Sequence, residues 1–196
     1  MKNFRYVLFS IFCISSSVVF ADNEKYTLDE THLSVGFLVD HAGYAKTLGM
    51  FTNASGSFMY DEEKGIVSDV QILIDTSSVF TNHEKRDSHL RSPDFLNVDK
   101  YPEMTFTANT NNLKTNPGKI EGTLTLLGVS KPLTLNARIN KIDIYPFRVG
   151  LSKPLVIGVS ASATFKRSDF GMNYAVEKKL VGDEINLIIE FEARQE

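Results

Sequence analysis

Apolar residues recur at every second position over most of this chain, and this alternation constrains its fold more than any other feature. The pattern runs through 33–39, 70–74, 104–108, 120–126, 133–139, 155–163 and 185–191. A period of two is typical of β-strands with one buried face and one face in water. A less regular strand, interrupted by Gly49 and Gly56, is expected over 48–60. Together these segments predict about eight antiparallel strands.

Clusters of turn-forming residues separate the predicted strands. They lie at 61–65, 116–118, 128–132 and 182–183. Eight antiparallel strands with one apolar face indicate either an up-and-down barrel or a two-sheet sandwich. We favour the barrel, because closing the sheet removes exposed edges.

The interior of such a barrel can be filled by side chains or can hold one small ligand. The alternation does not decide between these alternatives. Small residues at predicted inward positions and the absence of tryptophan favour a cavity; these small residues are Ala108, Gly122, Ala137, Ala161 and Ala163. Larger apolar residues at the other inward positions are predicted to form the wall of the cavity. They are Phe37, Val70, Ile72, Met104, Phe106, Leu124, Leu135, Ile157, Val159, Leu187 and Ile189.

One connection is much longer than the others. Between Asp75 and Met104 lie about 28 residues, whereas barrel strands are usually joined by two to five residues. The segment is rich in charge and contains Pro93 and Pro102. A short helix is expected over 83–91, with Asn82 as its N-cap and Pro93 preventing continuation. A charged connection of this length is usually functional or closes part of the structure.

The first 21 residues have the pattern of a secretory signal peptide. Lys2 and Arg5 precede an apolar run over 6–20, and Ala21 is the small residue at a cleavage site. The run is shorter than the roughly 20 residues of a membrane-spanning helix. We therefore expect cleavage after Ala21, a periplasmic location and no stable membrane span afterwards. An uncleaved anchor is the alternative.

Residues 22–196 are expected to form one domain without disulfides, because the single cysteine is Cys13. Loss of Lys2 and Arg5 reduces the basic residues from 21 to 19, against 24 acidic ones, so the net charge becomes about −5. This balance argues against nucleic-acid binding, which requires a basic face.

Catalytic and metal-binding patterns are weak in this sequence. His83, Asp87 and His89 match none of the usual zinc spacings. No Gly-x-Ser-x-Gly elbow is present, and no serine has an evident histidine and aspartate arrangement. The prediction is therefore a protein that is not an enzyme and has no metal site or cofactor.

Several motifs resemble those of the YceI-like family of bacterial periplasmic proteins. In the long connection these are Arg-Asp at 86–87, His-Leu at 89–90, Asp-Phe at 94–95 and Tyr-Pro at 101–102. Further blocks are DETHLSVGFLVDH (29–41), Gly49 with Phe51, GTLTLLGVSKPLTL (122–135), KRSDFGM (166–172) and VGDEINLIIEFEA (181–193). The resemblance covers nearly all of residues 22–196, in order and at compatible spacing.

The resemblance implies an all-β fold, an eight-stranded antiparallel, lipocalin-like β-barrel with one long, partly helical connection. It also implies binding, sequestration or transport of a polyisoprenoid or similar long-chain lipid, with a quinone-like molecule as one form of cargo. Arg86 and His89, with Asp87, are predicted either to anchor the head group of that lipid or to pin the connection to the barrel. Two other hypotheses are an enzyme acting on an isoprenoid-like substrate, and a filled barrel that works through its surface in stress or partner binding. The resemblance also makes a homodimer plausible.

Overall fold

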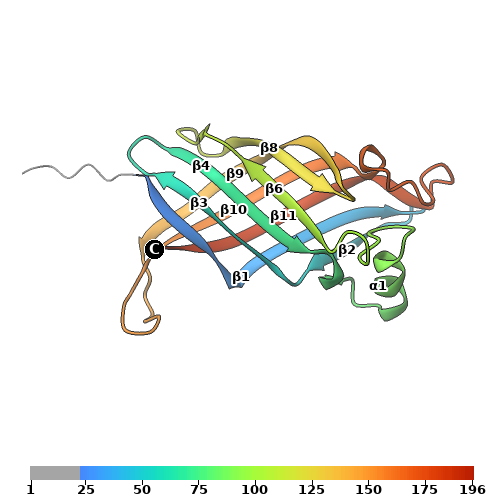
Figure 1. Cartoon of the computed structure of the whole chain (residues 1–196), viewed down its shortest axis with the longest axis horizontal. Coiled ribbons are helices and arrows are strands. Elements are labelled where there is room, and N and C mark those ends of the chain that lie inside the picture. Colours follow the sequence, from blue (N-terminus) through green and yellow to red (C-terminus); the bar gives the residue numbers. More distant parts are fainter. Residues whose placement is uncertain (1–22) are drawn as a thin grey trace, which may run out of the picture.

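A computed structural model describes residues 23–196 as a closed, elongated β-barrel with one α-helix at one end (Figure 1). Its strands are β1 (Glu24–His41), β2 (Ala45–Phe51), β3 (Ala54–Asp61), β4 (Ile66–Asp75), β5 (Val79–Phe80), β6 (Glu103–Ala108), β7 (Asn111–Asn112), β8 (Gly118–Leu126), β9 (Val129–Ile144), β10 (Leu155–Lys166) and β11 (Val181–Gln195). The helical elements are η1 (Thr76–Ser78), α1 (Glu84–Arg91) and η2 (Arg167–Phe170). The predicted signal peptide lies outside the described residues.

The barrel closes because β1 pairs with β11, the last strand of the sheet. The eight strands around it are β1, β3, β4, β6, β8, β9, β10 and β11, and every pairing between neighbours is antiparallel. The predicted all-β, eight-stranded barrel is therefore confirmed. β1 is long enough to pair with β3 along its first residues and with β2 along its last ones. Short β5 extends β2 at the α1 end.

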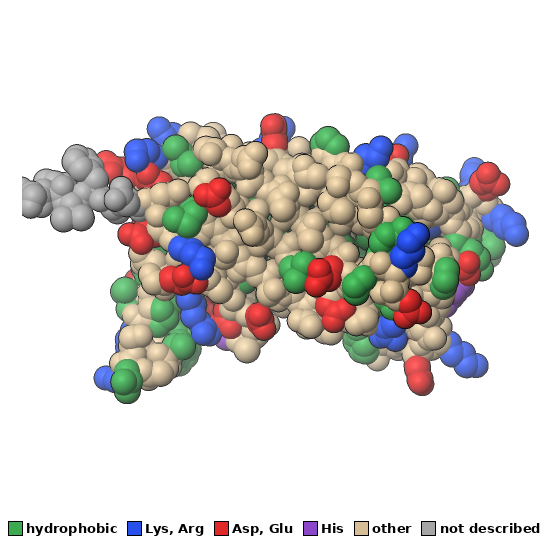
Figure 2. All heavy atoms as spheres, in the orientation of Figure 1, with side chains coloured by type: hydrophobic (Ala, Val, Ile, Leu, Met, Phe, Trp, Pro, Cys, Tyr) green, Lys and Arg blue, Asp and Glu red, His purple; other side chains and the backbone are tan. Residues whose placement is uncertain are grey.

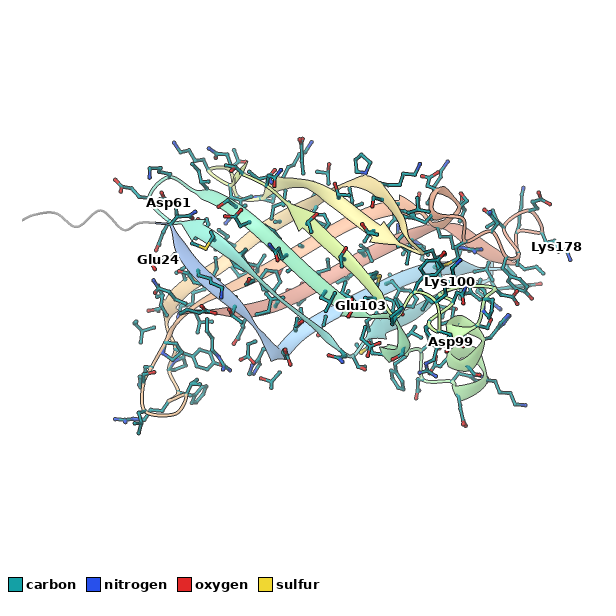
Figure 3. The ribbon with its side chains drawn as sticks, in the orientation of Figure 1. Glu24, Asp61, Asp99, Lys100, Glu103 and Lys178 are labelled. Atoms are coloured by element: carbon teal, nitrogen blue, oxygen red, sulfur yellow. The ribbon has the colours of Figure 1, made fainter. Side chains whose placement is uncertain are left out.

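The predicted alternation places apolar side chains inside. Phe106 is 5% exposed and Ile157 is 1% exposed, whereas Thr105, Thr107 and Gly158 beside them are less buried. Most charged side chains stand on the outside and at the ends of the barrel (Figure 3). Glu24 and Asp61 lie at the end where the described chain begins, and Asp99, Lys100 and Lys178 lie at the α1 end.

The single irregular strand predicted over 48–60 is wrong, because the structure has two strands there. β2 and β3 are separated at Thr52 and Asn53, not at the glycines. Gly49 lies inside β2, where the Phe37 ring covers it so closely that an added Cβ would stand 2.3 Å from that ring. Gly56 lies inside β3, where a Cβ would meet the Gln71 carbonyl at 2.3 Å. These glycines allow close packing inside strands rather than ending them.

Of the predicted turn 128–132 only Gly128 lies in a turn, and the predicted turn 182–183 is strand throughout. The β8–β9 turn is the two-residue pair Leu127–Gly128, both with positive φ as a type I′ hairpin requires. β9 then continues through Pro132, in a part of the strand that pairs with β8 only. Proline is tolerated at such an edge because its missing N–H removes no ladder bond. Gly182 and Asp183 belong to β11, and the real connection is 171–180.

The long connection runs from the end of β4 to the start of β6 and carries η1, β5 and α1. It covers one end of the barrel (Figure 1). The helix ends at Arg91, two residues before Pro93, as predicted. The predicted N-cap was wrong by one residue: His83 is the cap, and its Nδ1 accepts from the Arg86 backbone N–H at 3.2 Å. Asn82 instead adopts a left-handed backbone conformation.

Candidate ligand cavity

The barrel interior contains one long cavity with an apolar wall. Its volume is about 190 Å³. All eleven apolar residues predicted for the wall line it: Phe37, Val70, Ile72, Met104, Phe106, Leu124, Leu135, Ile157, Val159, Leu187 and Ile189. The alternation therefore placed these side chains at the cavity, and their contact with a ligand remains a proposal.

The cavity is long and narrow rather than round. On β1 its lining extends from Leu28 to Val39. Eleven steps of about 3.3 Å, on a strand tilted by roughly 40°, correspond to roughly 25–30 Å along the barrel axis. An engineered apolar cavity of about 150 Å³ holds a single benzene ring. A slightly larger volume distributed over that length has the shape of one extended chain.

The small residues that suggested a cavity contribute to it unequally. Ala137 and Ala161 line the open space. Gly122 does not open it, because the Phe106 ring packs against this glycine and an added Cβ would lie 2.4 Å from the ring. Ala108 and Ala163 are buried but are not part of the lining. Whether a small residue leaves open volume therefore depends on whether a neighbouring strand places an aromatic ring against it.

The α1 end of the cavity is closed by residues that the sequence analysis missed. Leu90, Phe95 and Leu96 from the long connection line the cavity together with Met172 and Val181. Phe95 and Leu96 follow a charged segment without any periodicity, so no strand or helix pattern identified them. Only their apolar character within a polar connection could have indicated burial.

An aromatic cluster holds the long connection against the loop 171–180. The His89 and Tyr174 rings meet edge to face with centroids 5.0 Å apart, and His89 meets Phe95 in the same way at 5.0 Å. Phe95 also contacts Tyr174 at 5.1 Å. Pairs of this kind contribute beyond the area that they bury. Because Phe95 also lines the cavity, this cluster forms part of the cover at the α1 end.

Arg167 is the one charged residue in the lining of this cavity. It is 1% exposed and donates to the backbone carbonyls of Gly182 (2.7 Å), Met172 (2.8 Å), Tyr174 (2.8 Å) and Val181 (2.9 Å). Burial lowers the pKa of Arg167, and the Asp183 carboxylate opposes that shift. Its guanidinium also lies 5.7 Å from the centroid of the Phe95 ring. These bonds show how Arg167 holds the loop 171–180.

Arg86 and His89 do not line the cavity. Arg86 donates from Nε to the Thr81 hydroxyl at 2.7 Å and from Nη2 to the Thr81 carbonyl at 2.7 Å. Buried Asp87 accepts from the Thr81 backbone N–H at 2.8 Å, and exposed His89 pairs with Asp94 at 2.9 Å. Their polar groups thus bind the connection to itself. We propose that both residues hold the connection in its own shape, rather than pin it to the barrel or anchor a head group.

Replacing Arg86 by alanine is expected to lower the free energy of unfolding by about 1–2 kcal/mol, because two hydrogen bonds from a charged group are lost. Affinity for a lipid in the barrel should change by less than about twofold, since the side chain does not reach the cavity. Urea unfolding and a lipid titration measure the two effects, with Lys85→Ala as the control on the same helix. A large loss of affinity at unchanged stability would restore the head-group role.

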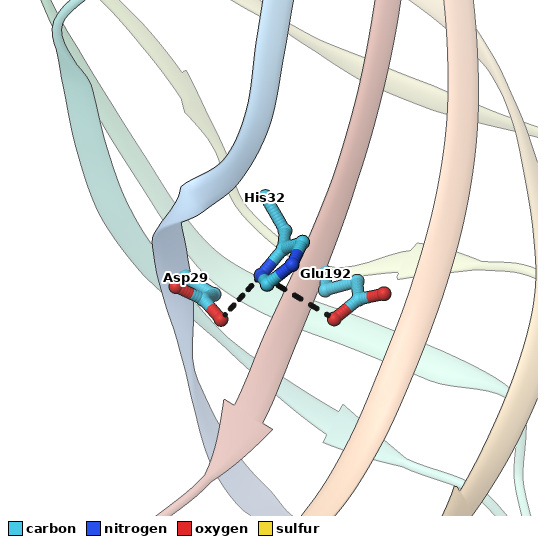
Figure 4. Close-up of side chains that lie close together, drawn as sticks. All are labelled: Asp29, His32 and Glu192. Carbon is cyan, nitrogen blue, oxygen red and sulfur yellow. Dashed lines mark hydrogen bonds and ion pairs between the residues drawn. The ribbon is translucent and has the colours of Figure 1, made fainter. Parts of the chain in front are cut away.

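A second polar cluster lies on the barrel wall, where the register of β1 against β11 shifts between Leu28 and Leu33. The His32 Nδ1 lies 2.9 Å from an Asp29 carboxylate oxygen and 3.8 Å from a Glu192 carboxylate oxygen (Figure 4). Arg194 forms an ion pair with the same Asp29 oxygen. The three ligand-type side chains are close enough to hold a metal ion, but Arg194 already neutralises the buried carboxylate. His32 thus belongs to this cluster and not to that of Arg86 and Asp87.

Asp29 should make the protein sensitive to acid. Burial raises the pKa of Asp29, but hydrogen bonds from Thr31 and His32 and the charge of Arg194 outweigh burial and lower it from 3.8 to about 2. A carboxyl group whose pKa is lower in the folded than in the unfolded state stabilises the fold at pH values above its unfolded pKa. This stabilisation is lost as the pH falls toward the folded pKa. We expect Asp29→Asn to lower the free energy of unfolding by about 2 kcal/mol at pH 7. At pH 3 this gap between the wild type and the variant should be roughly half as large.

Urea unfolding of the wild type and Asp29→Asn across this pH range measures the gap. Asp69→Asn is the control, because Asp69 is exposed and its left-handed backbone suits asparagine. A gap that is the same at pH 7 and pH 3 would mean that the Asp29 charge contributes no stability.

The comparisons with known proteins agree with the fold and the motifs. The family model of the YceI-like domain matches residues 26–193. The chain belongs to the YceI-like family. Protein YceI of Shigella flexneri is 34% identical over 195 residues, which cover 100% of this chain and 98% of the relative.

Solved structures of two similar proteins have the same barrel. The YceI protein of Campylobacter jejuni is 33% identical, with a TM-score of 0.70, covering 80% of this chain and 90% of that one. A polyisoprenoid binding domain from Saccharophagus degradans is 17% identical, with a TM-score of 0.61, covering 87% of this chain and 98% of that one. At that identity the second likeness shows a shared fold alone.

Proposed function

We propose that this YceI-like protein binds one polyisoprenoid or similar long-chain lipid inside its barrel, and sequesters or carries it without a chemical step. The observation that carries this proposal is the elongated cavity, whose wall is apolar along its whole length except at Arg167. The polyisoprenoid binding domain of Saccharophagus degradans shares the fold and supports the choice of ligand class. The inward residues of the strands would contact the chain.

The energetics favour a long ligand over a small one. Burial of one CH₂ group contributes about 0.8 kcal/mol, and micromolar affinity corresponds to about −8 kcal/mol. Association itself costs on the order of 4–15 kcal/mol. On the order of twenty buried carbons are therefore needed when no polar contact contributes. Isoprenoid and acyl chains reach this length, whereas a small aromatic molecule does not. Because a cavity of about 150 Å³ holds one six-carbon ring, the lining side chains would have to move apart for a space of about 190 Å³ to admit such a chain in full.

We also propose that the protein acts in the periplasm after removal of residues 1–21. The support is the signal-peptide pattern of the sequence. No helix within residues 23–196 is long and apolar enough to cross a membrane. The homodimer suggested by the resemblance remains a prediction, which size-exclusion chromatography with light scattering would test.

The deciding experiment is native mass spectrometry of the protein purified from a periplasmic extract, followed by solvent extraction of what co-purifies. We expect a stoichiometric mass gain that extracts as a long-chain isoprenoid or other lipid. Protein at its bare mass should take up a prenyl lipid that is added to it. If no lipid co-purifies and the protein takes up none of the added prenyl lipid, the interior does not bind lipid, and function must then be sought on the surface.

A further inference from the structure

The connection between β9 and β10 is a hairpin that projects from the barrel wall at the end away from α1 (Figure 1). It comprises residues 145–154. A backbone bond from the Tyr145 N–H to the Pro154 carbonyl (2.8 Å) closes its base, and one from the Val149 N–H to the Ser152 carbonyl (2.9 Å) closes its tip. Gly150 supplies the left-handed conformation that this tight tip requires. The hairpin therefore presents its side chains on a defined backbone.

Its apolar side chains face water instead of the barrel. Leu151 at the tip is 95% exposed, Phe147 is 68% exposed and Ile144 at the base is 54% exposed. The Phe147 ring meets the Tyr145 ring edge to face, with the centroids 5.7 Å apart. Large apolar residues gathered on one projection indicate a surface that contacts something other than water.

The charges of the hairpin have one sign. Arg148 and Lys153 stand beside the exposed apolar residues, and the segment 144–154 contains no Asp or Glu. Neither Arg148 nor Lys153 forms an ion pair with a carboxylate of residues 23–196. The chain as a whole has a net charge of −3. Figure 2 shows this projection at the lower left, with green and blue side chains close together.

We propose that the hairpin 145–154 docks the protein onto an anionic phospholipid surface. Phe147 and Leu151 would enter the boundary between head groups and acyl chains, and Arg148 and Lys153 would lie against lipid phosphates. Apolar insertion combined with basic flanking residues is how peripheral proteins bind such surfaces. This inference rests on the hairpin alone and does not require a lipid in the barrel.

The opposite end of the barrel provides an internal comparison. Tyr44 is 92% exposed and Leu48 is 61% exposed, so their exposure matches that of the hairpin. Lys46 faces Asp40 across the β1–β2 register and bonds to Asn186 at 2.6 Å. Lys178 and Lys179 lie in the adjoining loop, whose Leu180 carbonyl accepts from the Ala42 N–H, but they follow Glu177, so the charges at this end have mixed sign. Charge complementarity to an anionic bilayer therefore favours the hairpin over this turn.

A single tryptophan reports insertion directly, because the chain contains none. Phe147→Trp should show a blue-shifted, brighter emission when vesicles of phosphatidylglycerol and phosphatidylethanolamine are added. Vesicles of phosphatidylcholine alone should give little change. Tyr44→Trp, at the other end of the barrel, should not respond to either. Equal shifts for both variants, or no shift for Phe147→Trp, would overturn the proposal.

Vesicle flotation then tests the two kinds of side chain separately. Phe147→Ser with Leu151→Ser, and Arg148→Gln with Lys153→Gln, should each weaken binding to the anionic vesicles by roughly thirtyfold. Tyr44→Ser with Leu48→Ser should bind like the wild type. All variants have the same N-terminus, so residues 1–21 cannot cause a difference. Hairpin-dependent self-association without vesicle binding would assign the hairpin to a second copy and overturn the proposal.

Discussion

Replacing Arg167 by methionine is expected to lower the free energy of unfolding by about 3–5 kcal/mol, which is a large part of the whole free energy of unfolding of a domain of this size. Methionine fills a similar volume but leaves four carbonyls, those of Met172, Tyr174, Val181 and Gly182, without the donors that they have now. Unsatisfied buried acceptors are costly because no water replaces the lost donor.

Urea unfolding at neutral pH measures the effect as a lower midpoint at an unchanged slope. Arg167→Lys should fall between the wild type and Arg167→Met, because an ammonium group keeps the charge but lacks the planar fork that reaches all four carbonyls. Arg138→Met on the exposed side of β9 is the control, with an expected change within about 0.5 kcal/mol. A loss below about 1 kcal/mol for Arg167→Met would show that the loop 171–180 is held by other contacts.

Replacing Ala161 by phenylalanine is expected to reduce lipid affinity by at least about a hundredfold, because one ring would block the narrow cavity at that level. Ala161 lines the cavity and is paired with Ala137 on β9 and Ile189 on β11. A phenyl ring is about the size of benzene, which alone occupies an engineered cavity of about 150 Å³. The space here is about 190 Å³ but extends over roughly 25–30 Å, so one ring of that size closes its cross-section without filling its length.

The matched control is Ser162→Phe, which adds a ring at the next residue of β10, where the side chain is exposed. Its affinity should equal that of the wild type. Urea unfolding of both variants separates a blocked cavity from a misfolded barrel, since overpacking alone costs about 1–3 kcal/mol. Retained affinity in a folded Ala161→Phe variant would place the lipid outside the barrel.

Much of the barrel could be predicted because its determinants are local. Successive side chains of a strand point to opposite faces, so the alternation over 33–39 or 185–191 selects the inward residues without knowledge of the partners. The glycines and the proline at 132 misled the prediction because such residues usually end strands. Here tertiary contacts decided otherwise: the Phe37 ring covers Gly49, and Pro132 lies where β9 has one neighbour only.

The sequence by itself determined the all-β class, the approximate number of strands, the inward face of each strand and the length of the connection that covers one end. Whether the interior is open was decided only in three dimensions, because a packed core and a cavity wall have the same apolar pattern. The Phe106 ring fills the space beside Gly122, whereas Ala161 lines the open cavity. The role of Arg167 also required the structure, because the four carbonyls that it binds become neighbours only when the loop 171–180 folds back over the barrel end.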